Sequence, residues 1–213
     1  MNAHKITIID YGVGNLLSVY RGFEYCGAEV VITNNPKKIL SSSRIVLPGV
    51  GAFPNGMKAL NSLKLIDSLK EIAHRDLPLL GICLGMQLLL DEGEEFEISK
   101  GLGLIPGRVV PIPHQTIHGV KHKIPYIGWS SIVSNNSWKN TLLHENKERD
   151  YFYFVHSFMG LPLKSENIIA NYEYGGHQIP AMIQRGNVIG CQFHPEKSGE
   201  AGLKILKRFC VGQ

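Results

Sequence analysis

The feature that most constrains the fold is an alternation of short apolar runs with longer helical stretches in the first half of the chain. The strand-like runs are residues 5–10, 29–33, 44–47 and 79–82, and the helical stretches are about 15–25, 55–75 and 84–90. Strand, crossover helix and strand in succession indicate a parallel sheet with helices on both faces. The sequence therefore predicts an α/β fold with a mostly parallel central sheet flanked by helices.

The second half of the chain carries shorter strand-like runs that are separated by turns. These runs are 107–111, 127–133, 151–155, 168–174, 181–184 and 188–192. Turn signals at 175–176 and 185–187 favour mixed or antiparallel additions to the sheet. At 213 residues the chain suits one α/β domain, so we expect residues 1–213 to form a single domain.

Cys83 lies where the fourth apolar run turns into a helical stretch, within Gly81-Ile82-Cys83-Leu84-Gly85. Glycines two positions on either side of a residue permit the cramped turn that lifts a nucleophile above a sheet edge. A helix that begins there directs unpaired N–H groups toward the sulfur, which favours the thiolate over the thiol. Because most free cysteines are small buried hydrophobes, the elbow alone leaves a catalytic and a structural role open.

A histidine and a carboxylate follow the apolar run at 187–189, far from Cys83 in the sequence. His194 and Glu196 are two residues apart, so on an extended segment their side chains leave the same face. An imidazole that exchanges protons with a thiol, and a carboxylate that orients the imidazole, complete a nucleophilic triad. Each residue alone is better explained as structural or solvated, but the three together predict catalysis by Cys83, His194 and Glu196.

A series of motifs extends over nearly the whole chain. It comprises Ile9-Asp10-Tyr11-Gly12-Val13-Gly14-Asn15-Leu16, Leu47-Pro48-Gly49-Val50-Gly51-Ala52-Phe53, the elbow from Gly81 to Gln87, Ile127-Gly128-Trp129, Tyr153-Phe154-Val155-His156-Ser157-Phe158 and Phe193-His194-Pro195-Glu196-Lys197-Ser198. This series resembles the class I, or triad-type, glutamine amidotransferases. It is most similar to the family of glutaminase subunits of imidazole glycerol phosphate synthase, and the resemblance implies the class I glutamine amidotransferase fold.

The resemblance implies that the chain hydrolyses L-glutamine to glutamate and ammonia. The Cys83 thiolate attacks the carboxamide carbon, His194 gives a proton to the departing ammonia and later helps water attack, and Glu196 holds His194. The oxyanion needs preorganised N–H donors, for which the N–H groups of Leu84 and Val50 are the expected pair. No cofactor and no metal ion is implied for this domain.

The resemblance also assigns the residues that hold the glutamine substrate. They are Gly49, Gly51, Gln87, His156, Ser157 and Phe158. Gln87 lies four residues beyond Cys83, which is the same face of the expected helix. Two ordinary alternatives remain open: Gln87 is also a good helix former, and the Ser157 hydroxyl could simply bond to backbone.

Ammonia would be protonated and lost in water, and the family passes it directly into a (βα)₈-barrel cyclase subunit. The resemblance therefore implies a heterodimer with such a subunit, with Asn15, Trp129 and Lys197 at the interface. It also implies that the Val50 loop is rearranged when the partner is loaded, so that the isolated glutaminase is nearly idle. A large aromatic residue such as Trp129 is an ordinary interface anchor, although it could equally be buried in its own domain.

The tryptophan motif departs from the family pattern. This chain has Pro125-Tyr126-Ile127-Gly128-Trp129-Ser130 where the family usually has a run resembling P-H-M-G-W-N. The first hypothesis is histidine biosynthesis, in which the partner makes imidazole glycerol phosphate and an aminoimidazole carboxamide ribotide. The alternatives are a paralogous subunit that supplies ammonia for amidation of surface-polysaccharide sugars, and a stand-alone γ-glutamyl hydrolase with the same triad.

Composition excludes several other classes. The net charge of +4 comes from 22 basic and 18 acidic residues that are mixed along the chain, so we expect no nucleic-acid partner. No apolar run approaches the ~18 residues that span a bilayer, and the first residues do not resemble a signal peptide. The four cysteines have irregular spacings that suit free thiols. We therefore expect a cytoplasmic protein without membrane contact.

Two further motifs carry weaker signals. Gly12-Val13-Gly14 would need a third glycine at position 17 to match a dinucleotide fingerprint, and that position is Leu17. His114, His118 and His122 recur every four residues, which on a helix would form a metal-binding face. Because prolines flank this segment and Gly119 interrupts it, we expect an exposed hairpin or loop there and no metal site.

Overall fold

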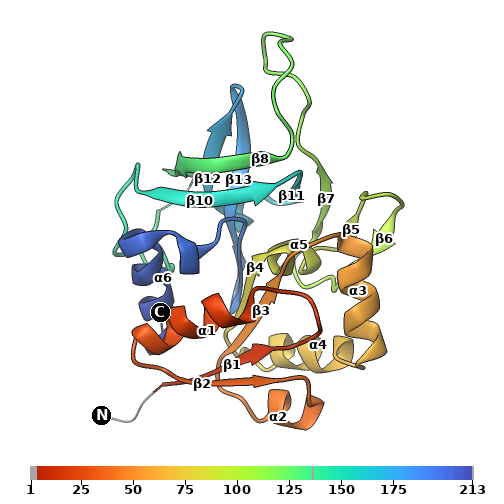
Figure 1. Cartoon of the computed structure of the whole chain (residues 1–213), viewed down its shortest axis with the longest axis vertical. Helices are drawn as coiled ribbons and strands as arrows, with labels where there is room; N and C mark the ends of the chain where they lie inside the picture. The colour runs from red at the N-terminus through yellow and green to blue at the C-terminus, as the bar shows by residue number, and fades with distance from the viewer. Residues whose placement is uncertain (1–3, 136, 213) are drawn as a thin grey trace.

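An eight-stranded sheet runs through the centre of the computed structural model, which describes residues 4–135 and 137–212 (Figure 1). Its order is β2-β1-β3-β4-β14-β13-β12-β9. The strands are β1 (Lys5–Ile9), β2 (Glu29–Thr33), β3 (Ile45–Gly49), β4 (Leu79–Cys83), β9 (Val133–Ser134), β12 (Ile168–Tyr174), β13 (His177–Arg185) and β14 (Val188–Cys191). Neighbours from β2 to β14 pair in parallel, and those from β14 to β9 pair antiparallel.

Two smaller sheets complete the β-structure. One pairs β8 (Tyr126–Ser131) with β10 (Tyr151–His156). The other has the order β11-β7-β5-β6 and contains β5 (Glu92–Gly93), β6 (Ser99–Lys100), β7 (Gly107–Pro111) and β11 (Phe158–Pro162). In Figure 1 β8 and β10 lie above β4, and β5, β6 and β7 lie to the right of α5, so both small sheets stand near the elbow.

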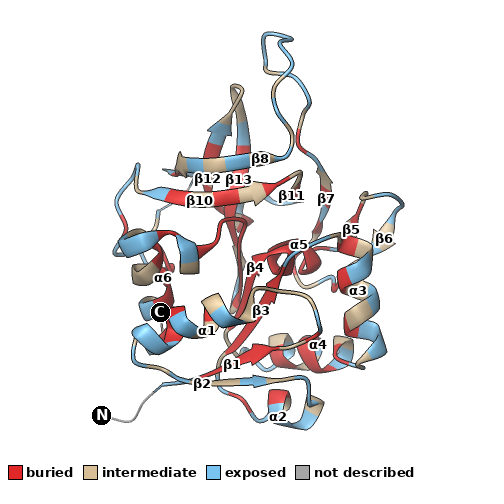
Figure 2. Cartoon of the chain, in the orientation of Figure 1, coloured by how far each residue is buried: buried red, intermediate tan, exposed pale blue. Residues whose placement is uncertain are grey.

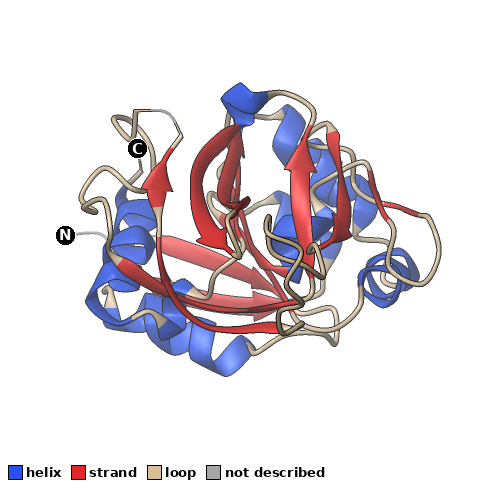
Figure 3. Cartoon of the chain, turned by 90° about the horizontal axis from the view of Figure 1, so that it is seen from above, coloured by secondary structure: helices blue, strands red, loops and turns tan. Residues whose placement is uncertain are grey.

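Helices cover both faces of the parallel strands, as the view from above shows (Figure 3). They are α1 (Leu16–Tyr25), α2 (Pro36–Leu40), α3 (Phe53–Ser62), α4 (Ile66–His74), α5 (Leu84–Leu88) and α6 (Gly199–Val211), with 3-10 turns η1 (Ser165–Asn167) and η2 (Pro195–Lys197). Helices α1 and α6 share one hydrophobic cluster, while α2 to α5 share a second one. Burial is densest in the strands between the two clusters (Figure 2).

The predicted fold class is confirmed: a mostly parallel sheet is flanked by helices and extended by antiparallel strands. Several boundaries differ from the prediction. The helix expected at 55–75 is two helices, because Lys64 has a φ of +56° and interrupts the hydrogen bonding. The strand expected at 127–133 is likewise split into β8 and β9. Residues 1–3 and 213, the ends of the predicted domain, lie outside the described residues.

Helix α2 and the strands β5, β6 and β11 were not predicted from the sequence. Helix α2 has only five residues, but its start carries a clear signal. Asn35 is the N-cap and accepts hydrogen bonds from the N–H groups of Lys37 and Lys38, with Pro36 at the first helical position. Strand β11 follows β10 after one residue, so a single apolar run hides two strands.

No helix in the described part of the chain is both long enough and apolar enough to cross a membrane.

The close packing of α6 on η2 positions the segment that contains His194 and Glu196. Gly202 of α6 lies against the backbone of Pro195, and a Cβ at Gly202 would come within 2.7 Å of the Pro195 carbonyl carbon. Leu206 of α6 also lies close to Gly22 of α1 in this region. A Cβ at Gly22 would lie 3.4 Å from Cβ of Glu196. The turn between His194 and Glu196 is therefore held by two helices.

We expect Gly202→Ala to destabilise the protein by about 3 kcal/mol or more, because the added methyl group meets backbone that cannot rotate away. Chemical denaturation measures the free energy of unfolding. Gly199→Ala on the same helix is the matched control. Gly199 has a φ of +57° and nothing within 4 Å of a Cβ, so its substitution costs only about 1 kcal/mol of backbone strain. Equal losses at both positions would contradict this packing.

Candidate active site

Cys83 ends β4 and directly precedes α5, which is the predicted strand-to-helix elbow. Its backbone has φ +56° and ψ −112°, a strained conformation for a residue other than glycine. Both flanking glycines are required by close contacts: a Cβ at Gly81 would lie 2.6 Å from the Gly85 oxygen, and one at Gly85 would lie 2.9 Å from the Leu47 carbonyl carbon. The glycines thus allow α5 to turn back across β3 and β4 and present the sulfur at the sheet edge.

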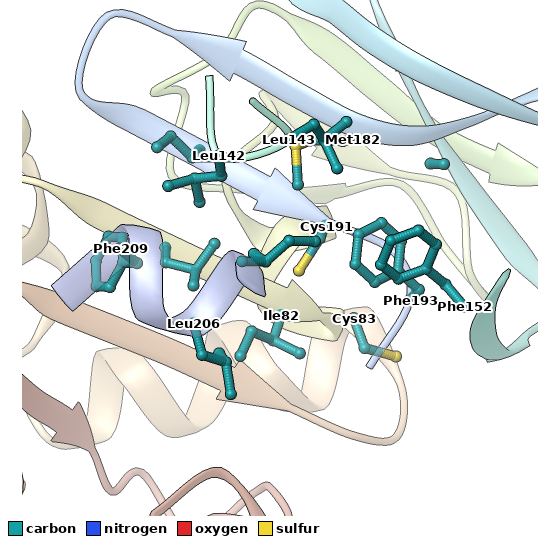
Figure 4. Packing of buried hydrophobic residues seen from close by; sticks show 14 of the residues in the cluster. Ile82, Cys83, Leu142, Leu143, Phe152, Met182, Cys191, Phe193, Leu206 and Phe209 are labelled. Carbon is teal, nitrogen blue, oxygen red and sulfur yellow. The ribbon is translucent and has the colours of Figure 1, made fainter. Parts of the chain in front are cut away.

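The Cys83 side chain lies between the core and a surface pocket. Figure 4 shows it at one end of a hydrophobic cluster, next to the rings of Phe152 and Phe193. It is 7% exposed. The pocket has a volume of about 480 Å³ and is lined by Val50, Gly51, Ala52, Cys83, Leu84, Gln87, Glu95, Pro125, Val155, His156, Ser157, Phe158 and His194. Most of the predicted site residues therefore share one pocket with the thiol.

His194 and Glu196 form a buried pair beside this pocket. His194 Nδ1 and Glu196 Oε1 are 2.7 Å apart, and the side chains are 4% and 0% exposed. His194 is extended, but Glu196 lies in the turn η2, so a turn rather than a continuous strand brings the two side chains together. The backbone there is fixed by Ser198, whose hydroxyl donates to the His194 carbonyl at 2.6 Å and accepts from the Tyr153 N–H at 3.0 Å.

The second ring nitrogen of His194 is available to Cys83. Nε2 is buried and has no hydrogen bond of normal geometry among the described residues. Burial lowers the pKa of His194, but the neighbouring Cys83 and the Glu196 carboxylate outweigh that effect and raise the pKa to about 10. The imidazole is therefore protonated at neutral pH. Its position between the sulfur and a carboxylate gives the three predicted residues the arrangement of a nucleophilic triad.

The Pro48–Gly51 loop lies beside the elbow because Gly49 pairs with Cys83 in the register of β3 and β4. A Cβ at Gly49 would come within 3.0 Å of Cβ of Leu84 and would collide with the Tyr11 hydroxyl. Val50 is 41% exposed, and Gly51 has a φ of +97°. The two residues predicted as oxyanion donors, Val50 and Leu84, thus lie on neighbouring segments and both line the pocket.

Tyr11 was not predicted to belong to the site. Its side chain is only 3% exposed, and its hydroxyl has no hydrogen-bond partner among the described residues. Burial, followed by the proximity of Cys83, raises the pKa of this hydroxyl. Tyr11 therefore remains a neutral phenol directly beneath the Gly49 loop.

Gln87 is held in a chain of buried amides. Its Nε2 donates to the Phe158 carbonyl and to Gln192 Oε1, both at 3.0 Å. Gln192 Nε2 in turn lies 3.8 Å from the Cys83 sulfur. Gln87 is thus not merely a helix former, because its side chain connects the pocket wall with the elbow.

His156 is fixed within the protein on both sides of its ring. Nδ1–H donates to the Phe158 carbonyl at 2.7 Å, and Nε2 accepts from the Tyr172 hydroxyl at 2.8 Å. Burial lowers the pKa of His156 to about 4, partly opposed by the bond to Phe158 and reinforced by nearby His194. The ring is therefore neutral and shapes the pocket wall, which Ser157 and Phe158 continue.

Trp129 and Lys197 lie on an exposed face next to His194. Trp129 is 53% exposed and meets the ring of Tyr153, on the neighbouring strand, at a centroid distance of 5.8 Å. Lys197 Nζ lies 6.0 Å from the centre of the same Tyr153 ring. Asn15 is half-buried at the start of α1. Tyr153, which the sequence analysis did not single out, joins two of the three predicted interface residues.

The segment with His114, His118 and His122 is a hairpin, as predicted. Gln115 and Lys121 form an antiparallel bridge, and the hairpin projects from the end of the molecule (Figure 1). The described residues contain no group of three or more His, Cys, Asp or Glu side chains that could hold a metal ion. His122 instead stacks on Tyr174 with a centroid distance of 4.2 Å.

Comparison with known proteins identifies the family. The model described as "Glutamine amidotransferase class-I" matches residues 7–213. The chain belongs to the class I glutamine amidotransferase family. Solved structures of this family share the fold at low sequence identity. One described as "Crystal structure of glutamine amidotransferase" has a TM-score of 0.72 at 15% identity and covers 97% of this chain and 99% of its own.

Curated amidotransferase relatives match over almost their full length. A protein of Legionella pneumophila (strain Lens) named "Imidazole glycerol phosphate synthase subunit HisH 1" is 48% identical over 208 residues, which cover 96% of this chain and 98% of that protein. "Imidazole glycerol phosphate synthase subunit HisH" of Lactococcus lactis is 44% identical and covers 96% and 97%. The resemblance stated from the motifs is thereby confirmed.

The low pKa of buried His156 predicts that the protein loses stability at acid pH. Its pKa is about 4 in the folded protein and about 6.5 when unfolded, so between these values the unfolded chain binds more protons. We expect the free energy of unfolding to fall by about 3 kcal/mol from this group as the pH falls from 6.5 to 4. Urea unfolding of the wild type and of His156→Gln measures the contribution, which the variant lacks. An equally steep acid loss in His156→Gln would contradict this assignment.

Proposed function

We propose that the chain is the glutamine-hydrolysing subunit of an imidazole glycerol phosphate synthase in histidine biosynthesis. The observation that carries the proposal is that Cys83 and His194, from opposite halves of the chain, line one pocket, while Glu196 pairs with His194 behind it. The identity of 48% to a protein named as a subunit of that synthase supports the pathway. The four cysteines are free thiols, which suits an enzyme of the reducing cytoplasm.

The proposed reaction begins with attack of the Cys83 sulfur on the carboxamide carbon of glutamine. The tetrahedral oxyanion is stabilised by the N–H groups of Leu84 and Val50. Collapse of this intermediate breaks the C–N bond, and His194, protonated at neutral pH, gives its proton to the nitrogen as ammonia leaves. A γ-glutamyl thioester remains on Cys83.

Water completes the reaction. His194, now neutral, accepts a proton from the water that attacks the thioester, and the carbon–sulfur bond breaks to release glutamate. Glu196 keeps Nδ1 of His194 hydrogen-bonded throughout, so Nε2 always faces the reacting atoms. The protein returns to its starting state without a cofactor.

Glu95 is the proposed partner of the substrate's α-ammonium group. It lines the pocket together with Gln87, and one of its oxygens accepts a hydrogen bond from the Phe53 N–H at 2.7 Å. Gln87 commits Nε2 to two protein acceptors, which leaves its carbonyl oxygen as the group that it offers. A carboxylate and an amide oxygen together complement a cation, while Gly51, Ser157 and Phe158 line the rest of the pocket. Gly49 does not line the pocket itself and precedes Val50, which does.

The outer face of β8 and β10 is the proposed contact for the barrel-shaped cyclase subunit. Ile127, Trp129 and Tyr151 are each more than half exposed there. Val155, on the same side of β10, also lines the pocket. A partner that covers this apolar face would therefore close the pocket as well and receive ammonia without exposure to water. Asn15 and Lys197 extend the proposed contact around the rim.

We expect Cys83→Ala to lower glutamine-dependent synthesis by the complex by about 10⁴-fold or more, because the nucleophile is removed. Synthesis from added ammonium salt should remain, since it requires only the partner's site. Both rates are measured with the purified complex and the cyclase substrate. Cys26→Ala, which changes a thiol that does not line the pocket, is the control.

Equal loss of both activities in Cys83→Ala would contradict the proposal that this chain hydrolyses glutamine and that the partner carries out the synthesis. Rapid glutamine turnover by the isolated chain would identify a stand-alone hydrolase instead. Co-purification from the native cell names the partner, and a partner from surface-sugar amidation would replace histidine biosynthesis as the pathway.

We expect Glu95→Gln to raise the KM for glutamine about tenfold with little change in kcat, because the lost charge faces the ammonium group rather than the reacting carbon. The introduced side-chain amide can still accept the hydrogen bond from the Phe53 N–H, so the fold should be retained. Glu94→Gln is the matched control, since Glu94 pairs with Arg108 at the surface at 3.4 Å. A fall in kcat without a change in KM would refute this role of Glu95.

A further inference from the structure

A buried glutamine outside the triad contacts the nucleophile. Parallel pairing aligns Cys191 of β14 with Ile82 of β4, so the next residue, Gln192, follows beside Cys83. Gln192 is 0% exposed, and its Nε2 lies 3.8 Å from the Cys83 sulfur in hydrogen-bonding geometry. The mechanism described above does not use this side chain.

The orientation of the Gln192 amide is set by Gln87. Gln87 Nε2 has two hydrogens, and it donates one to the Phe158 carbonyl and one to Gln192 Oε1. If the Gln192 amide were turned over, two NH₂ groups would face each other and Gln87 would lose an acceptor. The donor end of Gln192 must therefore face the sulfur.

The other polar neighbours of the sulfur act in different ways. The Val155 carbonyl, 3.9 Å away, is an acceptor and favours the protonated thiol. His194 exchanges protons with the sulfur, and Glu196 acts through His194. Tyr11 and Cys191 interact electrostatically with Cys83, and burial raises the pKa of each, so both stay neutral. Gln192 alone among these groups donates a hydrogen bond that does not depend on pH.

We propose that Gln192 is a fourth catalytic residue of this site: its amide donates to the Cys83 sulfur and stabilises the thiolate. Hydrogen bonds to charged groups are stronger than those to neutral ones, so the contact favours the thiolate over the thiol. Gln87 holds the donor in place and also lines the pocket. A single hydrogen-bonded chain therefore links the wall that receives the substrate to the sulfur that attacks it. The inference rests on the proposed function of the same site.

The test measures alkylation of Cys83 by iodoacetamide as a function of pH, with the Cys83 peptide quantified by mass spectrometry. Gln192→Met removes the donor at nearly constant volume. We expect its alkylation rate at pH 7 to fall at least about tenfold. The midpoint of the pH profile should move upward by about one unit, and the rate should recover at high pH. Gln178→Met, the same change at an exposed position of β13, should behave as the wild type.

Gln87→Met tests the chain without touching Gln192. It should move the Cys83 midpoint in the same direction by a smaller amount, because the Gln192 amide loses the donor that orients it. The double variant should show less than the sum of the two shifts, since both changes act on one contact. If Gln192→Met does not fold, the result with Gln87→Met decides the question.

An unchanged Cys83 midpoint in a folded Gln192→Met or Gln87→Met variant overturns the inference, and a lower melting temperature with an unchanged midpoint assigns a purely structural role. Alkylation requires neither glutamine nor a partner, so it is independent of the proposed function. A wild-type complex without glutamine-dependent activity but with a Gln192-dependent midpoint would disprove the function and keep the contact. Normal glutamine-dependent activity of the wild-type complex, with a Cys83 midpoint that does not depend on Gln192, would support the proposed function and disprove the role of Gln192.

Discussion

The contact between Gly85 of α5 and the Leu47 carbonyl of β3 is the constraint on which the rest of the site depends. It lets α5 cross the sheet edge with no side chain between the two backbones, and at the start of this crossing Cys83 adopts a φ of +56° and a ψ of −112°. The strain is maintained because β4 lies between β3 and β14, both parallel to it. The neighbouring strands then deliver the other groups: the Gly49 loop from one side and Gln192 with His194 from the other.

The two buried histidines near the pocket, His194 and His156, have different protonation states at neutral pH. His194 is surrounded by a sulfur and a carboxylate, and its pKa is raised to about 10. His156, one pocket wall away, is buried among a carbonyl and a hydroxyl, and its pKa is lowered to about 4. The two imidazoles therefore differ in charge at neutral pH, although both are almost fully buried. Burial lowers the pKa of both rings, so it is the neighbouring groups that make the pKa of His194 high and leave that of His156 low.

The sequence predicted the parts of the fold that follow from local patterns. Alternating apolar runs predicted the parallel strands, and paired glycines predicted the elbow at Cys83. Glu95 was missed because it lies in an acidic run that looks like solvated surface, and only the return of that run against α3 turns it toward the pocket. Gln192 was missed because its contact depends on the register of β14 against β4, which no local pattern specifies. Tyr153 likewise acquires its neighbours only through strand pairing.

In the proposed function, hydrolysis and ammonia transfer make opposite demands on water, and the pocket has a buried end and an open end at which these demands could be met separately. The sulfur and His194 lie at the buried end, where low exposure to water strengthens charge interactions. Val50 and Val155 lie at the open end, next to the exposed apolar face of β8 and β10. The proposed reaction requires that one water reach the thioester and that bulk water be kept from the ammonia. A partner seated on that face would restrict access at the rim and leave the buried groups as they are, so that its docking could control the fate of ammonia without rebuilding the triad.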